Sequence, residues 1–350
     1  MSPTVDGDND RPAPKVSIVV PAYNRERFLG RTLDSVLAQT VTEWDLVVSD
    51  DGSTDGTAEV AHDYARSDPR ISVVSAPNGG VARARNRGFA RTDSRSEYVI
   101  FLDSDDRWFP DTLESMIGAL EAHTELVSVY GVARCIDSED QPIPGDDLEE
   151  RMRERVEYRG WDLVEVGPDE PTTFGAMIFH NYTATPGLHL VRREVAERVG
   201  PFDPDTDPAD DWDMAIRISR IGPIGFLDRL VLEWRRHEQT LTGTSPRWRA
   251  ANWSVRAKTL AATDNTPEQR RLARVGYLGA GRTMLGRARS HARHVDPGPT
   301  LRELGLAADC VVQYVKVAFP LWLRRLRVGP TPTVSGPPGA KVDRQSGSRR

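Results

Sequence analysis

Three aspartates that follow an apolar run are the residues of this sequence best suited to bind a metal ion. The run over 98–102 is aromatic and β-branched, which is typical of a buried strand, and Asp103, Asp105 and Asp106 lie within the next four positions. Carboxylates packed together repel one another unless a cation or hydrogen-bond donors neutralise them. Hard oxygen ligands suit Mg²⁺ or Mn²⁺, which typically join carboxylates to substrate phosphates. The alternative is a solvated acidic turn, the simpler explanation of an isolated Asp-x-Asp pair.

Strands alternate with helices over the first hundred residues. The expected strands are 16–20, 45–49, 71–74 and 98–102, and the expected helices are 27–39, 58–67 and 81–90. This alternation predicts an α/β fold with a Rossmann-like, mostly parallel sheet and helices on both faces. The first strand is expected to end at Pro21, because proline cannot continue a central ladder. Further on we expect a helix over 111–123, a strand over 126–131 and a mobile loop over 137–147.

Polar residues follow each of the first four strands. They are Pro21 to Asn24, the pair Asp50-Asp51, Asn78 to Gly80 and the aspartates after residue 102. Ligands of such sheets bind beyond the carboxyl ends of the strands, so we expect these clusters to share one crevice. Neither Gly-x-Gly-x-x-Gly after the first strand nor a Gly-x-x-x-x-Gly-Lys-Ser/Thr loop occurs. Phosphate binding would therefore depend on a metal and on Arg83, Arg85 and Arg87, of which helical spacing lets at most two face the crevice.

The segments 16–25, 45–57, 78–88 and 98–106 resemble the successive motifs of the family 2 glycosyltransferases, which have the GT-A fold. The resemblance covers residues 15–240. It implies an inverting transfer of one sugar from a nucleotide-diphosphate sugar to a hydroxyl of a glycan, lipid-linked or small-molecule acceptor, with Mn²⁺ or Mg²⁺. By position it implies that Pro21, Tyr23, Asn24, Asp50 or Asp51 and Asp103 hold the nucleoside, and that Asp105, with Asp106, holds the metal. The structural alternatives are that Tyr23 covers the sheet and that Asn24 caps the following helix.

Asp210, Asp211 and Asp213 form a second acidic cluster before an expected helix over 214–219. Acids at this place also stabilise a helix N-terminus without any catalytic role. The resemblance assigns the general base to Asp211, ahead of a helix that carries Arg217; an inverting transfer needs a carboxylate to accept the acceptor's hydroxyl proton. Because Asp210 stands where the family usually has Glu, Asp210 and Asp213 are the alternative bases.

The segment 231–242, with Trp234-Arg235-Arg236-His237, resembles the family segment in which a histidine follows a basic pair after the last strand. The resemblance implies that His237 binds the metal or the diphosphate. The alternative is an ordinary surface or packing histidine. The stretch 172–191, which includes Asn181-Tyr182-Thr183, corresponds in the family to the region near the acceptor, but it carries no ligand-binding motif.

The net charge of −6 conceals a basic carboxyl-terminal region. Residues 247–350 hold 20 of the 46 Lys and Arg but only 6 of the 52 Asp and Glu, which leaves 26 and 46 for the rest. Such a region suits a polyanion or an anionic membrane surface, and the segment 304–327 combines apolar, aromatic and arginine residues as an interfacial helix does. The alternatives are that these cations pair with the acidic part of the chain, and that the helix packs on the catalytic domain or on a second copy.

The predicted organisation is a disordered tail over 1–14, a GT-A catalytic domain over 15–245, a helical basic extension over 246–328 and a disordered tail over 329–350. Two cysteines, no signal peptide and no long apolar segment favour a cytoplasmic protein, with peripheral contact on the inner face of the membrane as a variant. We expect no nucleic-acid partner. The alternative function is a non-catalytic nucleotide- or glycan-binding protein on a degenerate fold, against which the intact Asp103, Asp105 and Asp211 argue.

Overall fold

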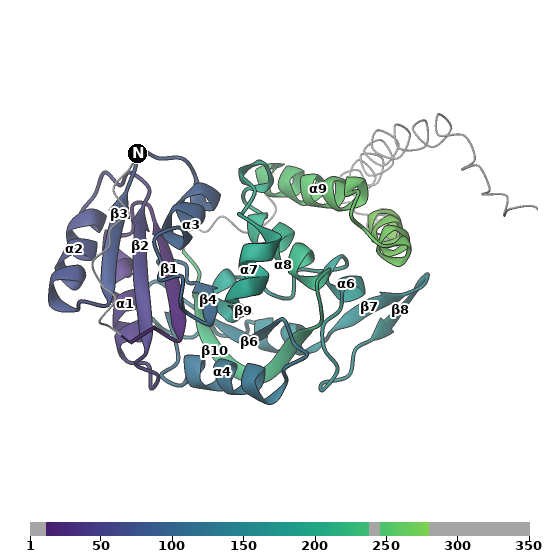
Figure 1. The fold of residues 1–350 in the computed structure, drawn as a ribbon, viewed down its shortest axis with the longest axis horizontal. Helices are drawn as coiled ribbons and strands as arrows, with labels where there is room; N and C mark the ends of the chain where they lie inside the picture. The colour runs from purple at the N-terminus through teal and green to yellow at the C-terminus, as the bar shows by residue number, and fades with distance from the viewer. Residues whose placement is uncertain (1–11, 238–245, 280–350) are drawn as a thin grey trace, which may run out of the picture.

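The computed structural model describes residues 12–237 and 246–279, which form a mixed α/β fold around one twisted sheet (Figure 1). The eight strands of the sheet lie in the order β3-β2-β1-β4-β9-β6-β10-β5, and β7 and β8 form a separate hairpin. The strands are β1 Val16–Ala22, β2 Trp44–Asp50, β3 Ile71–Ser75, β4 Tyr98–Phe101, β5 Arg107–Trp108, β6 Ser128–Ile136, β7 Val156–Arg159, β8 Asp162–Glu165, β9 His189–Arg192 and β10 Ile224–Arg235. The tail over 329–350 and the segment 304–327 lie outside the described residues, as does most of the tail over 1–14.

The first four strands confirm the predicted parallel half of the sheet. β1 lies between β2 and β4 and is parallel to both, and β2 is parallel to β3. The other half contains two antiparallel strands that the sequence analysis did not predict. β9 pairs antiparallel with β4 and β6, and β5 pairs antiparallel with β10. The predicted strand over 126–131 is β6, which continues to Ile136 because β10 pairs with it along most of its length.

The prediction that β1 ends at Pro21 is wrong, since the strand continues to Ala22 in register with β2. The backbone groups of alternate residues point to opposite neighbours. The carbonyl of Val19 accepts from Leu102 on the β4 side, whereas the carbonyl of Ala22 accepts from Asp51 on the β2 side. Pro21 therefore directs its missing N–H toward β4, whose pairing with β1 ends at Val19. The proline removes no ladder bond there.

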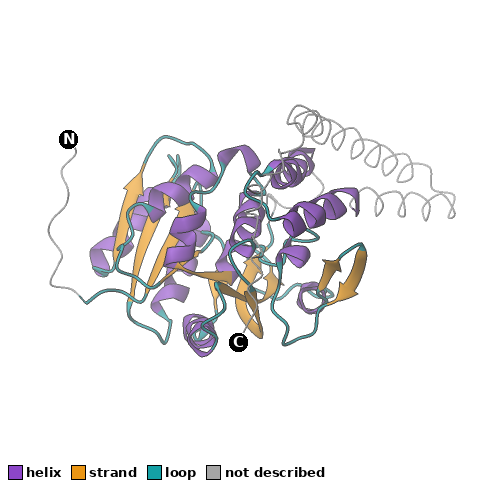
Figure 2. Cartoon of the chain, turned by 45° about the vertical axis from the view of Figure 1, so that its right-hand side comes forward, coloured by secondary structure: helices purple, strands orange, loops and turns teal. Residues whose placement is uncertain are grey.

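The described helices are α1 Glu26–Leu37, α2 Thr57–Ser67, α3 Val81–Phe89, α4 Thr112–Ala122, α5 Leu148–Arg153, α6 Phe174–Met177, α7 Arg193–Val199, α8 Asp210–Ser219 and α9 Pro246–Ala261, the 3₁₀ turns η1 Pro186–Leu188 and η2 Pro204–Thr206, and a helix over 267–279. Helices cover both faces of the sheet, as predicted (Figure 2). The chain moves outward from β1 through β2 to β3 and then returns over them to β4. Because parallel crossovers are right-handed, this reversal places α3 on the face opposite α1 and α2.

Close packing brings α3 to the carboxyl ends of β1 and β2. Gly88 makes this approach possible, since a Cβ at that position would clash with the side chain of Val19. The buried side of α3 includes Ala84 and Arg85, and the exposed side includes Arg83. The sequence therefore directs one arginine of the helix inward, at the end of the sheet where ligands of such folds bind.

The first turns of the carboxyl-terminal region pack against the rest of the fold. α9 contacts η2 and α8, where Lys258 donates to Asp203 and Asp213. Arg247 pairs with Asp207, and Arg220 pairs with Asp264. Arg247 and Lys258 of the extension thus pair with acids of the preceding chain, which is the alternative that the charge asymmetry left open, whereas the Arg220–Asp264 pair has the opposite sense. In the described ranges, no helix has both the length and the apolar character needed to cross a membrane.

Candidate active site

A cavity of about 480 Å³ opens at the carboxyl ends of β1, β2 and β4. The predicted crevice is thus present, and α8 and the segment before η1 close its other side. The residues that line it are Pro21, Ala22, Tyr23, Arg25, Asp51, Asn78, Gly80, Val81, Ala84, Arg85, Asp103, Ser104, Asp105, Ala184, Thr185, Pro186, Asp207, Pro208, Asp210, Asp211, Trp234, Arg235 and Arg247. Both acidic clusters predicted from the sequence therefore meet in one cavity, although about a hundred residues separate them in the chain.

Asp51 is the member of the Asp50-Asp51 pair that lines the cavity. Its Oδ2 accepts from the backbone N–H groups of Gly79 and Gly80, at 2.9 and 2.8 Å. Gly80 has a φ of +92°, which other residues adopt only with strain. Asp50 instead accepts from the backbone N–H of Ser53, and both aspartates are almost fully buried, at 3% and 2% exposed. Asp50 therefore shapes the loop after β2, while Asp51 joins that loop to the start of α3.

Tyr23 and Asn24 follow β1 but have different surroundings. Tyr23 lines the cavity and is 43% exposed, which leaves its ring open to a ligand. Asn24 adopts a φ of +52°, and its Oδ1 accepts from the N–H of Thr54 at 2.8 Å. The residue at the N-cap of α1 is Arg25, so the alternative that Asn24 caps this helix is wrong. Asn24 instead holds the loop after β2 against the loop after β1.

Arg85 joins the two acidic clusters. Its Nη2 lies 2.7 Å from Oδ1 of Asp103, and its Nη1 lies 2.7 Å from Oδ2 of Asp210. Burial alone would lower the pKa of this guanidinium, but the two carboxylates outweigh that effect and raise the pKa. The other two candidate arginines contact the Asp51 region. Arg83 donates to the carbonyl of Gly79, and Arg87 donates to Asp51.

Asp105 lies between two basic side chains at the edge of the cavity. Its Oδ2 is 3.0 Å from Nε of Arg25 and 2.9 Å from Nε2 of His237, whose ring stacks on Phe28. Burial would raise the pKa of Asp105, but the hydrogen bond from His237 and the charge of Arg25 outweigh it, so that the pKa is lowered. Asp105 and His237, two of the three residues predicted to hold the metal, therefore lie side by side.

This pair fits a divalent cation. Asp105 would supply a carboxylate oxygen and His237, when neutral, a ring nitrogen, and both types of atom bind such ions. No group of three or more His, Cys, Asp or Glu side chains able to hold a metal occurs in the described part of the chain. Mg²⁺ and Mn²⁺ commonly take only one or two protein ligands and complete their shell with substrate phosphates and water. The donor set thus suits an ion that binds together with a phosphate ligand.

Asp106 is placed differently from its predicted role as a metal ligand. It is 1% exposed, and its two oxygens accept from the N–H of Arg235 at 2.9 Å and from Oγ1 of Thr185 at 3.1 Å. Burial, together with the nearby charges of Asp105 and Asp103, raises its pKa well above the usual value. Asp106 therefore fastens the end of β10 and the segment before η1, and we withdraw it from the metal site.

The three acids at the start of α8 have three different environments. The helix begins at Asp210, so these acids lie in its first turn and not ahead of it as predicted. Asp213 accepts from Arg217 at 2.9 Å and from Lys258 at 2.8 Å and is a structural anion. Asp210 is buried against Arg85. Asp211 also lines the cavity, but the two groups that donate hydrogen bonds to it are uncharged.

Asp211 has the electrostatic properties of a general base. Its Oδ2 is 3.1 Å from Nδ2 of Asn181, and its Oδ1 accepts from the N–H of Trp212 at 2.7 Å. Burial and then the charge of Asp210 raise its pKa to about 7, while Arg85 acts in the opposite direction. A base with a pKa near 7 is about half ionised at neutral pH, and its carboxylate form accepts a proton more readily than an ordinary aspartate does.

Several cavity residues were missed by the sequence analysis. Arg25 is part of the motif over 16–25 but drew no separate prediction. Thr185 lies in the stretch without a ligand-binding motif, and Trp234 and Arg235 belong to the segment before His237, of which only His237 was predicted to bind. Arg247, in the first turn of α9, lies 3.0 Å from Asp207, so the predicted extension contributes a residue to the cavity. No local signal in the sequence could have placed Arg247 there.

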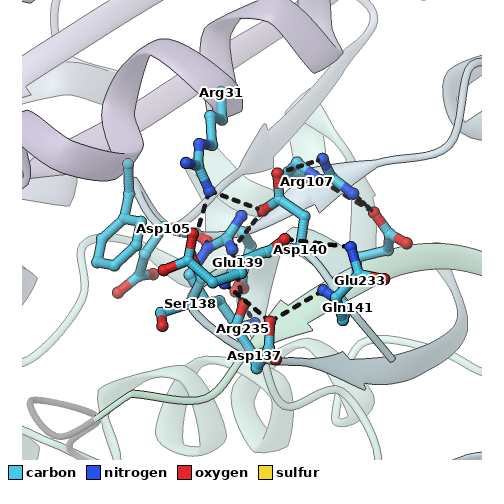
Figure 3. A network of polar contacts seen from close by, with 12 residues as sticks. Arg31, Asp105, Arg107, Asp137, Ser138, Glu139, Asp140, Gln141, Glu233 and Arg235 are labelled. Carbon is cyan, nitrogen blue, oxygen red and sulfur yellow. Dashed lines mark hydrogen bonds and ion pairs between the residues drawn. The ribbon is translucent and has the colours of Figure 1, made fainter. Parts of the chain in front are cut away.

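Arg235 lines the cavity and connects it to the loop after β6 (Figure 3). It donates to the carbonyls of Asp105 and Asp137, each at 2.8 Å, and pairs with Asp140. Arg107 and Arg31 also pair with Asp140, at 2.9 and 3.2 Å. These contacts tie the start of the loop predicted as mobile to α1, β5 and β10.

The chain is similar to known glycosyltransferases in sequence. A family model described as "Glycosyl transferase family 2" matches residues 17–200. The chondroitin synthase of Pasteurella multocida (strain Pm70) is 30% identical over 217 residues, which are 62% of this chain and 20% of that protein. The putative teichuronic acid biosynthesis glycosyltransferase TuaG of Bacillus subtilis (strain 168) is 43% identical over 105 residues, 30% of this chain and 41% of that protein. The matches thus span well under two thirds of these relatives' own length.

Solved structures share the fold. The structure of S. aureus TarS 1-349 in complex with UDP-GlcNAc has a TM-score of 0.58 at 19% identity, over 85% of this chain and 81% of that one. The mannosyltransferase PcManGT from Pyrobaculum calidifontis, in complex with GDP-Man and Mn²⁺, has a TM-score of 0.52 at 21% identity, over 88% of both chains. At these identities the likeness concerns the fold alone, and it confirms the predicted GT-A architecture.

Proposed function

The chain belongs to glycosyl transferase family 2, and from this premise we propose that it moves one sugar from a nucleotide-diphosphate sugar to an acceptor hydroxyl, with inversion at the anomeric carbon. One observation carries the proposal. Asp211, the carboxylate suited to act as a base, lines the same cavity as Asp51, Asp103 and Asp105. A base and a nucleotide site in one cavity are what a single displacement requires.

In this proposal the donor nucleotide occupies the part of the cavity at the carboxyl ends of β1, β2 and β4. Tyr23 offers an exposed ring to the nucleobase of the donor. Asp51 and Asp103 offer carboxylates to the N–H groups of the nucleobase or to the hydroxyls of the ribose. Four arginines of the described residues line the cavity, and of these Arg85 and Arg25 would face the diphosphate. Asp105 and His237 would hold the divalent ion, which supplies positive charge to the diphosphate when it is bound.

The proposed reaction is one displacement. Asp211 accepts the proton of the acceptor hydroxyl while that oxygen forms a bond to the anomeric carbon. The bond between this carbon and the diphosphate oxygen breaks, and the diphosphate leaves with the electron pair. Because the hydroxyl attacks from the face opposite the diphosphate, the configuration inverts. Arg85 lies between Asp103 and Asp210 and compensates the negative charge that develops on the leaving group.

The names of the relatives bear on the acceptor. One relative is named a chondroitin synthase, and another a putative teichuronic acid biosynthesis glycosyltransferase. We therefore propose a hydroxyl of a glycan, free or lipid-linked, as the acceptor, with a small molecule as the alternative. The cytoplasmic location, contact with the inner face of the membrane and the domain boundary at residue 245 remain predictions. Fractionation of cells into supernatant and membrane pellet tests the first two.

Thermal unfolding with UDP, GDP, dTDP and CDP and their common sugar conjugates, each with and without Mn²⁺, tests donor binding. A ligand that binds only the native state raises the melting temperature. We expect one nucleotide to give a clear rise that Mn²⁺ enlarges, and the matching sugar nucleotide then to transfer its sugar in an acceptor screen. The rival function is a binding protein on a degenerate fold. If that protein binds nucleotides, it predicts the same stabilisation but no transfer with any acceptor. No stabilisation by any nucleotide would contradict the proposed transfer and favour a glycan-binding protein.

A further inference from the structure

The segment 181–187 connects the two acidic clusters of the cavity. At one end Nδ2 of Asn181 lies 3.1 Å from Oδ2 of Asp211, and at the other end Oγ1 of Thr185 lies 3.1 Å from Oδ2 of Asp106. The carbonyl of Gly187 accepts from the indole of Trp108 at 2.8 Å, which anchors the segment to β5. The position of Asp211 relative to the donor side of the cavity is therefore linked to this one stretch of chain.

The orientation of the Asn181 amide follows from its neighbour Thr183. The Oδ1 of Asn181 accepts from the backbone N–H of Thr183 at 3.2 Å and lies 3.1 Å from its Oγ1. A backbone N–H can only donate, so the amide oxygen has to face Thr183. The amide nitrogen then has to face Asp211. Thr183 is 2% exposed, so water has little access to this arrangement.

The other oxygen of Asp211 is also held. Its Oδ1 accepts from the N–H of Trp212, whose indole donates to the carbonyl of Met177 at 2.7 Å. Trp212 is 3% exposed, so the start of α8 is packed firmly against α6. With one donor on each oxygen, the plane of the Asp211 carboxylate is defined, and its remaining lone pairs are available to a ligand in the cavity.

We propose that Asn181 is a positioning residue for the transfer: it orients the Asp211 carboxylate toward the acceptor hydroxyl and is itself oriented by Thr183. The inference rests on the proposed function, in which Asp211 is the base. It gives a role to the Asn181-Tyr182-Thr183 stretch, for which the sequence analysis found no ligand. A misplaced catalytic group reduces the chemical step while the donor still binds normally.

The hydrogen bond from Asn181 also favours the ionised carboxylate, so its loss raises the pKa of Asp211. The titratable and charged groups around Asp211 are Asp210 on its own helix, Arg85 on α3 and Asp103 after β4. All three remain in an Asn181 variant. The acid limb is the part of the pH profile in which kcat rises as Asp211 ionises. A shift of this limb in an Asn181 variant would therefore result from the lost amide donor and not from a changed charge in the cavity.

Asn181→Ala and the pair Thr183→Val and Thr183→Ser test the proposal. We expect Asn181→Ala to lower kcat by about tenfold to a hundredfold, with little change in the KM for the donor, and to move the acid limb of the pH profile to higher pH. Thr183→Val has nearly the same shape as threonine but lacks the hydroxyl, so it should show the same changes to a smaller degree. Thr183→Ser keeps the hydroxyl and should remain near wild type.

The melting temperature with and without nucleotide, measured on each variant, separates positioning from folding. An unchanged nucleotide-induced rise together with a lower kcat supports the proposal. Wild-type kcat and an unmoved acid limb in Asn181→Ala would overturn it, as would loss of nucleotide binding. If Asn181→Ala does not fold, Thr183→Val and Thr183→Ser test the proposal instead. Equal kcat values and equal acid limbs in these two variants would then overturn it. Asp211→Asn separates a failure of the proposed function from a failure of the role proposed for Asn181. If Asp211→Asn retains transfer, the proposed function has the wrong base. If Asp211→Asn is inactive while Asn181→Ala keeps wild-type activity, only the role of Asn181 is wrong.

Discussion

Arg85 and Asp210 form an ion pair of 2.7 Å across the cavity, although 125 positions separate them in the chain. The two residues are 4% and 1% exposed, so the pair is almost completely removed from water. It joins α3 to α8 and neutralises one of the two adjacent acids that line the cavity. The difference between Asp210, which has a charged partner, and Asp211, which has uncharged donors, is the basis for choosing the base.

Arg85→Ala should destabilise the protein, because it leaves Asp210 buried without its cation. Breaking a buried ion pair from one side typically costs about 3–5 kcal/mol in the free energy of unfolding. Arg83→Ala is the matched control, since Arg83 lies on the exposed side of the same helix and should change stability by less than about 0.5 kcal/mol. Urea unfolding of the two variants measures the difference. Equal stabilities would show that the pair contributes nothing to the fold.

The rate of transfer should depend on the ionisation of Asp211. Its pKa of about 7 predicts that kcat rises with pH and reaches half its maximum near pH 7. The charge of Asp210 contributes to this raised value, so Asp210→Asn should move the acid limb to lower pH. Asp211→Asn should abolish transfer while nucleotide binding remains. A profile that is flat between pH 5 and pH 9 would argue against a titrating carboxylate as the base.

Asp211 should also lower the stability of the protein at high pH. Its pKa is raised in the folded state, so the folded protein holds this proton more tightly than the unfolded chain does. Stability is therefore lost as the pH rises from about 4, near the ordinary value of an aspartate, through 7. Asp211→Asn should melt at a higher temperature than wild type at pH 8 and at nearly the same temperature at pH 4. Asp162→Asn, an exposed site on β8, is the control and should show no such trend.

Neighbouring aspartates after β4 should respond differently to loss of charge. Asp105→Asn removes the carboxylate beside His237, so it should abolish the part of the nucleotide-induced rise in melting temperature that depends on Mn²⁺. Asp106→Asn should retain that part, because its oxygens are directed to Arg235 and Thr185 and not into the cavity. Loss of the Mn²⁺ effect in Asp106→Asn would restore Asp106 to the metal site.

The sequence predicted the parallel half of the fold because apolar runs and helical spacing are local signals. It also predicted that polar clusters after consecutive strands share a crevice, since the carboxyl ends of parallel strands meet at one edge. β9, β5 and the extension of β6 were missed because they depend on partners far along the chain. The end of β1 was placed one residue early because the harm done by a proline depends on which neighbour its missing N–H faces.

For the site, the sequence by itself determined which residue types are present and in which clusters. Asp103 and Asp105, Asp51 and Asp211 lie in the cavity as their motifs indicated. Choosing between adjacent residues needed the tertiary structure. Asp50 or Asp51, Asp105 or Asp106, and Asp210 or Asp211 differ by one position, and neighbouring side chains leave the backbone in different directions. Only the packing of α3, α8 and the segment 181–187 decides which carboxylate meets Arg85, which meets Asn181 and which lies beside His237, because those contacts join residues distant in the chain.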